Sequence, residues 1–351
     1  MSAEPTGEDP DEALVAAILE AEHEARLAEL IRSPEQVEAL IEQDALRLDF
    51  DLVLDLSGGL AALGSHDTAQ LVAVSAFADG DVKIMAAGKL ALGWIELSRG
   101  RHRKALEEVD GAVALANPDL DVVAEAAYLR GVILESRGKR AQAAAEYEKA
   151  IGWSRPRSAG QAALSLAEML AEAGDDEQAV EVLGIAFESG VAHVVPQAAL
   201  QLALIRDRLG DVEGSIPLYR EAMESGVPSA APRAAFHLGE ILLGAGDVEG
   251  ARDAFETAYA TGDPEFTPKA AVNLGTIYME AGRVREAYAC FETATGSPDR
   301  NVAALGHCYV GVVLADTDAA AAERHLRAAM KQGDRQVKEM ASNVLRQLRR
   351  R

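Results

Sequence analysis

Residues 268–303 read PKAAVNLGTIYMEAGRVREAYACFETATGSPDRNVA, and this arrangement of small and apolar residues recurs along most of the 351-residue chain. One glycine in each copy marks the repeat, and successive copies lie 36 residues apart, with a single interval of 38. These glycines are Gly64, Gly100, Gly138, Gly174, Gly210, Gly246 and Gly282. Self-similarity at a fixed period of this length indicates an array of stacked supersecondary units.

Each unit has the pattern of a helix–turn–helix hairpin. Its apolar residues recur at spacings of 3, 4 and 7, which is typical of amphipathic helices and not of strands. Small residues before and after the glycine would let two helices approach closely. The glycine suits the end of the first helix, and the Asp that often follows it, as in Gly210-Asp211, suits the start of the second. Seven units are predicted to start at Phe50, Ala86, Ala124, Gly160, Pro196, Pro232 and Pro268, and an eighth near Ala304.

One unit carries the following residues at fixed spacings: Leu274-Gly275, Tyr278, Gly282, Ala287, Phe291, Ala294 and Pro298. Their types and spacings resemble the tetratricopeptide repeat, and the resemblance covers residues 50–337. The period of 36 residues departs from the family's period of about 34. The family's Trp is replaced, for example by Ala199 and Ala235. The resemblance implies an all-α fold, a right-handed α-solenoid of helix–turn–helix repeats that winds into a superhelix.

The flanking sequence predicts a cap at each end of the array. Residues 1–10 form an acidic segment that is expected to be disordered, and residues 11–49 are expected to form N-terminal capping helices. The first is predicted over Asp11–Ile31, and Ser33-Pro34-Glu35-Gln36 is predicted to open a second that runs to about Asp49. The array then occupies residues 50–335. Residues 336–351 form a C-terminal capping helix with a basic end, because a solenoid's last apolar edge needs a polar-backed cover.

The charge excludes several classes of partner. The chain has 34 Lys and Arg against 57 Asp and Glu, a net charge of −23, which repels nucleic acid and anionic membrane surfaces. No apolar run approaches the length of about 20 residues that a membrane-spanning helix needs, so no membrane insertion is expected. The start lacks a basic signal-peptide region, and only two Cys are present, which favours a cytoplasmic location. Abundant Ala and an excess of Arg over Lys are typical of a bacterial protein.

No catalytic or cofactor motif is found in the sequence. It lacks the phosphate-binding loop, the G-x-S-x-G nucleophile turn, and the paired Cys or His ligands of a zinc site. Cys290 and Cys308 are interpreted as small buried apolar residues. The protein is therefore predicted to be no enzyme and to bind no cofactor or metal.

The resemblance also implies a binding face. In the family the first helices of the hairpins line a concave groove. Here the fifth position of successive units is apolar, which predicts a hydrophobic floor that includes Tyr128, Leu164, Leu200 and Phe236. Trp94 lies at a position that faces the groove by the same resemblance. A partner segment is predicted to lie along residues 86–310.

The second position of the units becomes basic toward the C-terminus. Arg233 is expected to pair with His237, and Lys269 with Asn273, because residues four apart are neighbours on a helix. The four resemble half of the family's carboxylate clamp. Glu240 and Leu204 stand where the clamp has Asn, so the other half is missing. The alternative is a solvated face that Glu240 and Glu280 partly neutralise.

The favoured function is a protein-interaction scaffold or adaptor, which holds a partner peptide or helix in this groove. One alternative is a structural or assembly subunit that oligomerises through its edges and caps. Another is an effector-sensing regulatory subunit. The sequence leaves the oligomeric state open between them.

Overall fold

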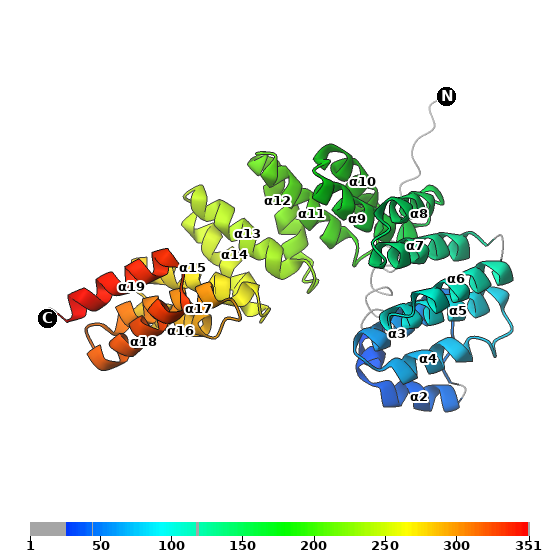
Figure 1. Ribbon diagram of the computed structural model, residues 1–351, viewed down its shortest axis with the longest axis horizontal. Coiled ribbons are helices and arrows are strands. Elements are labelled where there is room, and N and C mark those ends of the chain that lie inside the picture. Colours follow the sequence, from blue (N-terminus) through cyan, green and yellow to red (C-terminus); the bar gives the residue numbers. More distant parts are fainter. Residues whose placement is uncertain (1–25, 44, 117–118, 350–351) are drawn as a thin grey trace, which may run out of the picture. The chain divides into compact units, whose positions relative to one another are not determined.

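The computed structural model describes residues 26–43, 45–116 and 119–349, and over these residues the chain forms α-helices joined by short turns (Figure 1). It divides into two compact units, residues 1–173 (unit 1) and 174–351 (unit 2). No helix in the described ranges is long and apolar enough to cross a membrane. The predicted all-α solenoid of helix–turn–helix repeats is confirmed.

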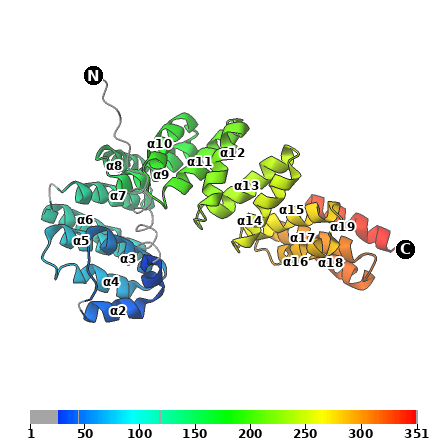
Figure 2. The same ribbon diagram turned by 180° about the vertical axis from the view of Figure 1, so that it is seen from behind.

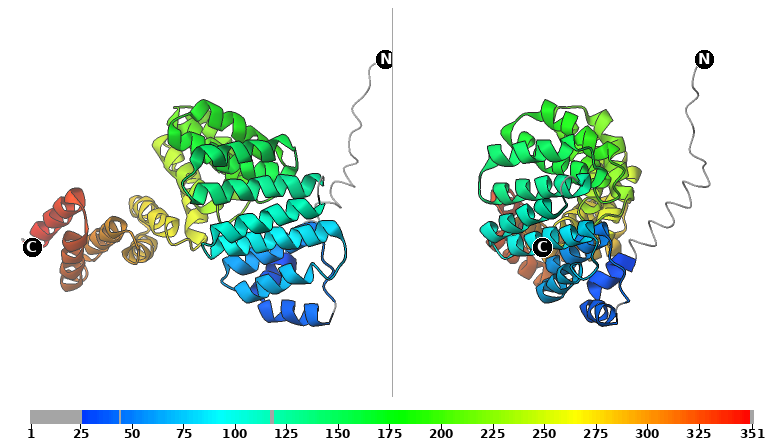
Figure 3. Two further views of the ribbon diagram at one scale, coloured as in Figure 1. Left: turned by 45° about the vertical axis from the view of Figure 1, so that its right-hand side comes forward. Right: turned by 90° about the vertical axis from the view of Figure 1, so that its right-hand side faces the viewer.

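Unit 1 contains three complete hairpins, and they stack in chain order (Figures 1 and 3). Residues 26–32 are helical and precede the first full helix. The helices are α2 (Pro34–Glu42), α3 (Phe50–Ala62), α4 (His66–Ser75), α5 (Val82–Ser98), α6 (His102–Ala116), α7 (Leu120–Ser136), α8 (Arg140–Gly152) and α9 (Pro156–Ala173). The hairpins pair α3 with α4, α5 with α6 and α7 with α8.

Unit 2 continues the same pattern with four hairpins, which Figure 2 shows from behind. Its helices are α10 (Asp176–Glu188), α11 (Val195–Arg208), α12 (Val212–Glu224), α13 (Ala231–Gly244), α14 (Val248–Ala260), α15 (Phe266–Glu280), α16 (Val284–Thr295), α17 (Arg300–Leu314), α18 (Ala319–Gln332) and α19 (Arg335–Leu348). Helix α19 packs on α17 and α18 and ends the described chain.

The repeated glycines end the first helix of each hairpin, as predicted. Gly210 and Gly246 both have φ of +84°, a left-handed conformation that side chains with a Cβ rarely adopt. Where the next residue is Asp, its side chain caps the second helix. Asp211 accepts a hydrogen bond from the backbone N–H of Gly214, and Asp247 accepts one from that of Gly250, each at 3.0 Å.

Close packing within the hairpins explains the small residues seven positions before those glycines. A Cβ added at Gly131 would lie 2.4 Å from the ring of Tyr147, and one added at Gly239 would lie 2.6 Å from that of Phe255. Both rings are fully buried. The aromatic side chain of the second helix thus lies directly against the backbone of the first, and the same contact recurs between Gly275 and Phe291.

The ends of several elements differ from the predicted ones. Helix α2 ends at Glu42 and not near Asp49, and Asp49 instead caps α3 by accepting the N–H of Leu52 at 2.8 Å. Ser33 precedes α2 without a side-chain capping bond. The first helices of the repeats begin up to four residues before the predicted unit starts. Residues 1–10 and most of the helix predicted over Asp11–Ile31 lie outside the described residues.

Candidate functional site

The groove residues predicted in unit 1 lie on its first helices, and two of them contact each other. Trp94 of α5 and Tyr128 of α7 have ring centroids 5.7 Å apart, and Tyr128 lies 6.1 Å from the ring of Tyr147. Leu164 of α9 is only 8% exposed. The aromatic pair therefore packs within the unit, and Leu164 presents little surface to a partner.

An ionic cluster joins the first helices of unit 1, and we call it the Arg157 cluster: Arg157, Asp55, Glu125, Ser158 and Trp94. Arg157 of α9 donates two hydrogen bonds to Asp55 of α3, from Nη1 at 2.9 Å and from Nη2 at 2.5 Å. Ser158 donates to Glu125 Oε2 at 2.8 Å, and the Trp94 indole donates to the same carboxylate. Four helices, α3, α5, α7 and α9, thus contribute to one network.

The cluster places a carboxylate in an apolar environment with one principal counter-charge. Glu125 is 2% exposed, and burial raises its pKa above the ordinary value. Arg157 and the bonds from Ser158 and Trp94 oppose that rise, and Asp55 reinforces it. Arg157 is therefore the cation on which both Asp55 and Glu125 depend.

The Arg157 cluster gives the predicted groove residues of unit 1 contacts within the unit. Trp94 and Tyr128 were expected to contact a partner, whereas Trp94 bonds to Glu125 and Tyr128 lies against Trp94. The repeat pattern did not point to Arg157, since it precedes its predicted unit start at Gly160. Asp55 and Arg157 are 102 residues apart, and no local pattern connects them.

Unit 2 carries a second group of aromatic residues, which we call the aromatic patch: Phe236, His237 and Phe266. The ring centroids of Phe236 and Phe266 are 5.8 Å apart, and those of His237 and Phe266 are 6.4 Å apart. His237 also stacks on the buried ring of Tyr219 at 5.9 Å. All three residues of the patch are partly exposed. The patch is therefore accessible to solvent, and the buried Tyr219 ring packs against its inner side.

The charges around the aromatic patch are not paired as predicted. Lys269 binds Glu265 at 2.7 Å, with its ammonium 4.9 Å from the Phe266 ring centroid, and His237 Nδ1 lies 3.3 Å from Glu240. His237 and Lys269 thus each contact a carboxylate one turn away, where Arg233 and Asn273 were the expected partners. The partner of Lys269 is thus Glu265 in place of the expected Asn273.

Arg233 differs from its neighbours in having no counter-ion. Its side chain is exposed, and no carboxylate in the described part of the chain lies within ion-pair distance of it. Its charge is close enough to the Tyr219 hydroxyl to lower the pKa of that group, against the rise that burial causes. An unpaired cation therefore stands beside the aromatic patch.

The predicted apolar floor is largely buried. Leu200 is 5% exposed and belongs to the core of unit 2, where Phe236 and Val272 pack against it from the partly exposed side. Leu90 and Cys308, at the same repeat position, are fully buried. This position packs between neighbouring helices, and in unit 2 Phe236 and Val272 are its partly exposed members.

Comparison with protein families identifies the repeat. Models of the tetratricopeptide repeat match residues 90–159, 200–266 and 268–298. The chain is a tetratricopeptide repeat protein. Such repeats generally mediate protein–protein interaction, and scaffolds of this class are typically non-catalytic. A search of curated protein sequences finds no match.

Solved structures similar to this tetratricopeptide repeat protein include two Sel1-type solenoids. A Sel1 repeat protein from Oxalobacter formigenes is 19% identical, with a TM-score of 0.51, and the match covers 91% of this chain and 93% of that one. The protective antigen c5321 of uropathogenic Escherichia coli is 17% identical, with a TM-score of 0.54, covering 89% and 71%. At these identities the likeness establishes the fold alone.

A buried hydroxyl beneath the aromatic patch provides a test of the geometry. Tyr147 donates a 2.6 Å hydrogen bond to Glu135, whereas the equivalent Tyr219 has no hydrogen-bond partner in the described part of the chain and faces the shorter Asp207. Asp207→Glu should supply the missing acceptor and stabilise the protein by about 1 kcal/mol in urea denaturation.

The reciprocal change serves as the control. Glu135→Asp shortens the acceptor of Tyr147 and should destabilise the protein by a similar amount. If both substitutions shift the urea midpoint in the same direction, the length of the acceptor does not decide whether these hydroxyls are satisfied.

Proposed function

We propose that this protein is a non-enzymatic interaction scaffold that binds a segment of a partner protein across the aromatic patch and Arg233. The observation that carries the proposal is the unpaired Arg233 beside three partly exposed rings. Aromatic side chains and Arg are the residue types that contribute most energy to protein interfaces. The equivalent face of unit 1 is filled by the Arg157 cluster, which supports placing the contact on unit 2.

The chemistry of the surface defines the partner segment. An apolar or aromatic side chain would pack on Phe236 and Phe266, and an acidic group would meet Arg233 in a charge-assisted hydrogen bond. In a chain of net charge −23, an acidic partner needs such a local reversal of charge. The expected occupant is therefore a short amphipathic segment with an acidic residue beside its apolar anchor.

The state of the two thiols supports a non-catalytic role. Cys290 and Cys308 are the only thiols, both are buried, and burial raises the pKa of each to about 11. Neither is a thiolate near neutral pH, and the thiolate is the nucleophilic form.

Site-specific photo-crosslinking tests this proposal. A photoreactive phenylalanine analogue at position 236 should link a partner in cell extract, whereas the same analogue at Arg220, exposed on α12, should not. Once mass spectrometry identifies the partner, calorimetry with the full chain should show that Arg233→Glu weakens binding roughly tenfold or more, with a reduced salt dependence.

The matched control is Arg220→Glu, the same charge change in the same unit, which should leave binding unchanged. Phe236→Ala should weaken binding in a way that salt hardly alters, because that contact is apolar. Equal losses for the reversals at Arg233 and Arg220 would show that only the net charge matters. Crosslinks confined to position 220 would place the partner on the second helices.

A further inference from the structure

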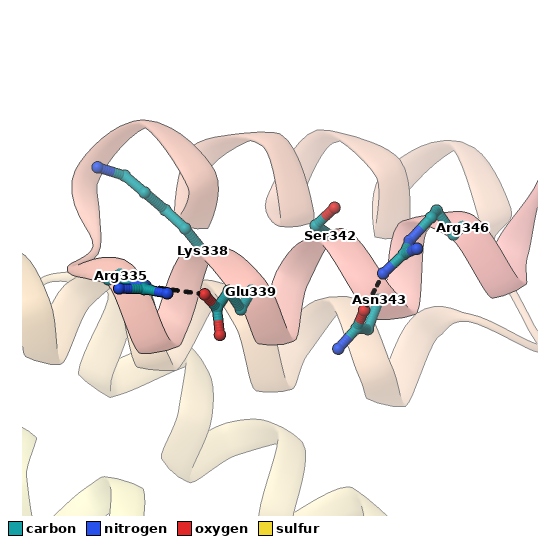
Figure 4. Close-up of a pocket in the computed structure, with 6 residues that line it drawn as sticks. All are labelled: Arg335, Lys338, Glu339, Ser342, Asn343 and Arg346. Carbon is teal, nitrogen blue, oxygen red and sulfur yellow. Dashed lines mark hydrogen bonds and ion pairs between the residues drawn. The ribbon is translucent and has the colours of Figure 1, made fainter.

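The outer face of α19 is a basic surface at the end of the array. Six side chains line a shallow depression of about 560 Å³ on this helix, and we call them the α19 face: Arg335, Lys338, Glu339, Ser342, Asn343 and Arg346 (Figure 4). All but Ser342 are exposed. The face therefore presents charged groups along the whole length of the helix.

The opposite side of α19 fixes the helix in place. Val337, Ala341 and Leu345 are buried against α17 and α18. Asp334 caps the helix by accepting the N–H of Val337 at 2.9 Å, and its own backbone N–H donates to Asn301 of α17 at 2.9 Å. The cations of the α19 face therefore belong to a helix whose position is fixed by core packing and by hydrogen bonds at its first turn.

The positive charge of this face is mostly uncompensated. Arg335 is paired with Glu339 at 3.0 Å, and Arg346 bonds to the neutral amide of Asn343 (Figure 4). Lys338 has no carboxylate within ion-pair distance in the described part of the chain. Residues 331–351 hold seven Lys and Arg against two acids, in a chain of net charge −23.

We infer that the α19 face docks the acidic N-terminal segment, residues 1–25, of a second copy of this chain. That segment has eight Asp and Glu and neither Lys nor Arg. Two molecules of charge −23 repel each other, so self-association requires contact where the charge is locally reversed. Each copy carries both the basic face and the acidic segment, which allows the reciprocal contacts of a symmetric dimer.

This surface is separate from the aromatic patch, which lies on α13 and α15. The two proposals can therefore fail independently. If a charge-reversal variant of the α19 face loses self-association but keeps the partner crosslink at position 236, the result supports the docking proposal and leaves the proposed scaffold function intact. If the chain self-associates as proposed but position 236 gives no partner crosslink, only the proposed scaffold function is overturned.

Zero-length crosslinking of the full chain tests the pairing directly. A carbodiimide joins a Lys amine to a carboxylate only where the two are in contact. In an equal mixture of ¹⁴N- and ¹⁵N-labelled chains at low salt, Lys338 should be linked to carboxylates of residues 1–25 in mixed-isotope peptides. Links from Lys338 to that segment only within one chain, or none at all, would overturn the proposal.

Charge reversal provides the quantitative test. Lys338→Glu with Arg346→Glu should weaken self-association at least roughly tenfold in sedimentation equilibrium, and raised salt should do the same to the unmodified chain. Lys104→Glu with Arg137→Glu is the matched control, because these exposed cations line another basic surface, on unit 1. The proposal fails if the control pair weakens association as much, or if neither pair changes it.

Discussion

Arg157→Met should lower the free energy of unfolding of unit 1 by about 3 kcal/mol, the lower end of the loss expected when a buried charge, here Glu125, is left without its counter-charge, because Arg157 itself is only partly buried. Methionine keeps most of the side-chain volume, so the loss reports the charge. Glu125 would stay almost fully buried without its principal cation, and Asp55 would lose two hydrogen bonds. Trp94, bonded to Glu125, gives a local fluorescence readout in a Trp153→Phe background.

An exposed ion pair is the control for this loss. Arg103 pairs with Glu107 one turn away, with 91% of its side chain exposed. Arg103→Met should therefore change the stability by less than about 0.5 kcal/mol. If Arg157→Met and Arg103→Met shift the denaturation midpoint equally, Arg157 does not stabilise the carboxylates of Glu125 and Asp55, and the prediction is wrong.

The pH dependence of the Arg157 variant identifies the group responsible. Burial raises the pKa of Glu125 and Arg157 opposes that rise, so removing Arg157 raises the pKa further. A carboxyl whose pKa is raised on folding contributes stability at low pH that is lost as the pH rises through the folded pKa. The deficit of the variant should accordingly shrink toward acid pH. Adding Glu125→Gln should remove most of it near neutral pH.

The sequence predicted the parts of the fold that depend on local geometry. A glycine every 36 residues indicates a helix end because only the left-handed conformation seen at Gly210 and Gly246 continues the chain into the next helix. The small residues at Gly131 and Gly239 are required by single aromatic contacts within one hairpin. Because these features recur in successive units, several parts of the sequence lead to the same prediction of a helical hairpin.

The site could be predicted only in part, because it depends on how hairpins converge. Arg157 meets Asp55 across two intervening hairpins, and that distance follows from packing along the whole unit. Lys269 was assigned to Asn273, one turn later, although Glu265 lies one turn earlier and carries the opposite charge. A comparison of both helical neighbours would have favoured Glu265.

Gly275→Ala should destabilise unit 2 by about 1–3 kcal/mol, as expected for overpacking in a core. The added Cβ would lie 2.3 Å from the ring of Phe291, far closer than side chains approach one another. Phe291 is fully buried and stacks on Tyr309 with ring centroids 4.6 Å apart, so the ring cannot retreat freely. Urea denaturation of the full chain measures the loss.

The same substitution elsewhere in unit 2 should have the opposite effect. Gly184 lies inside α10, and a Cβ there would meet no heavy atom within 4 Å. Gly184→Ala should therefore stabilise the protein by about 0.5–1 kcal/mol, because alanine loses less backbone entropy in a helix than glycine does. A loss at both sites would mean that the clash with Phe291 is not the cause.

A second change in the same hairpin separates the clash from any other effect of the new methyl group. The chain itself has Ala167 at the glycine position and Leu183 at the aromatic position of another unit. Phe291→Leu should cost stability alone, since it removes ring volume from a packed core. Combined with Gly275→Ala, the two should cost less than the sum of the single losses, because the smaller side chain makes room for the added Cβ. Additive losses would show that the methyl group added at position 275 and the side chain at position 291 do not compete for the same space, and the small residue of the repeat would then need another explanation.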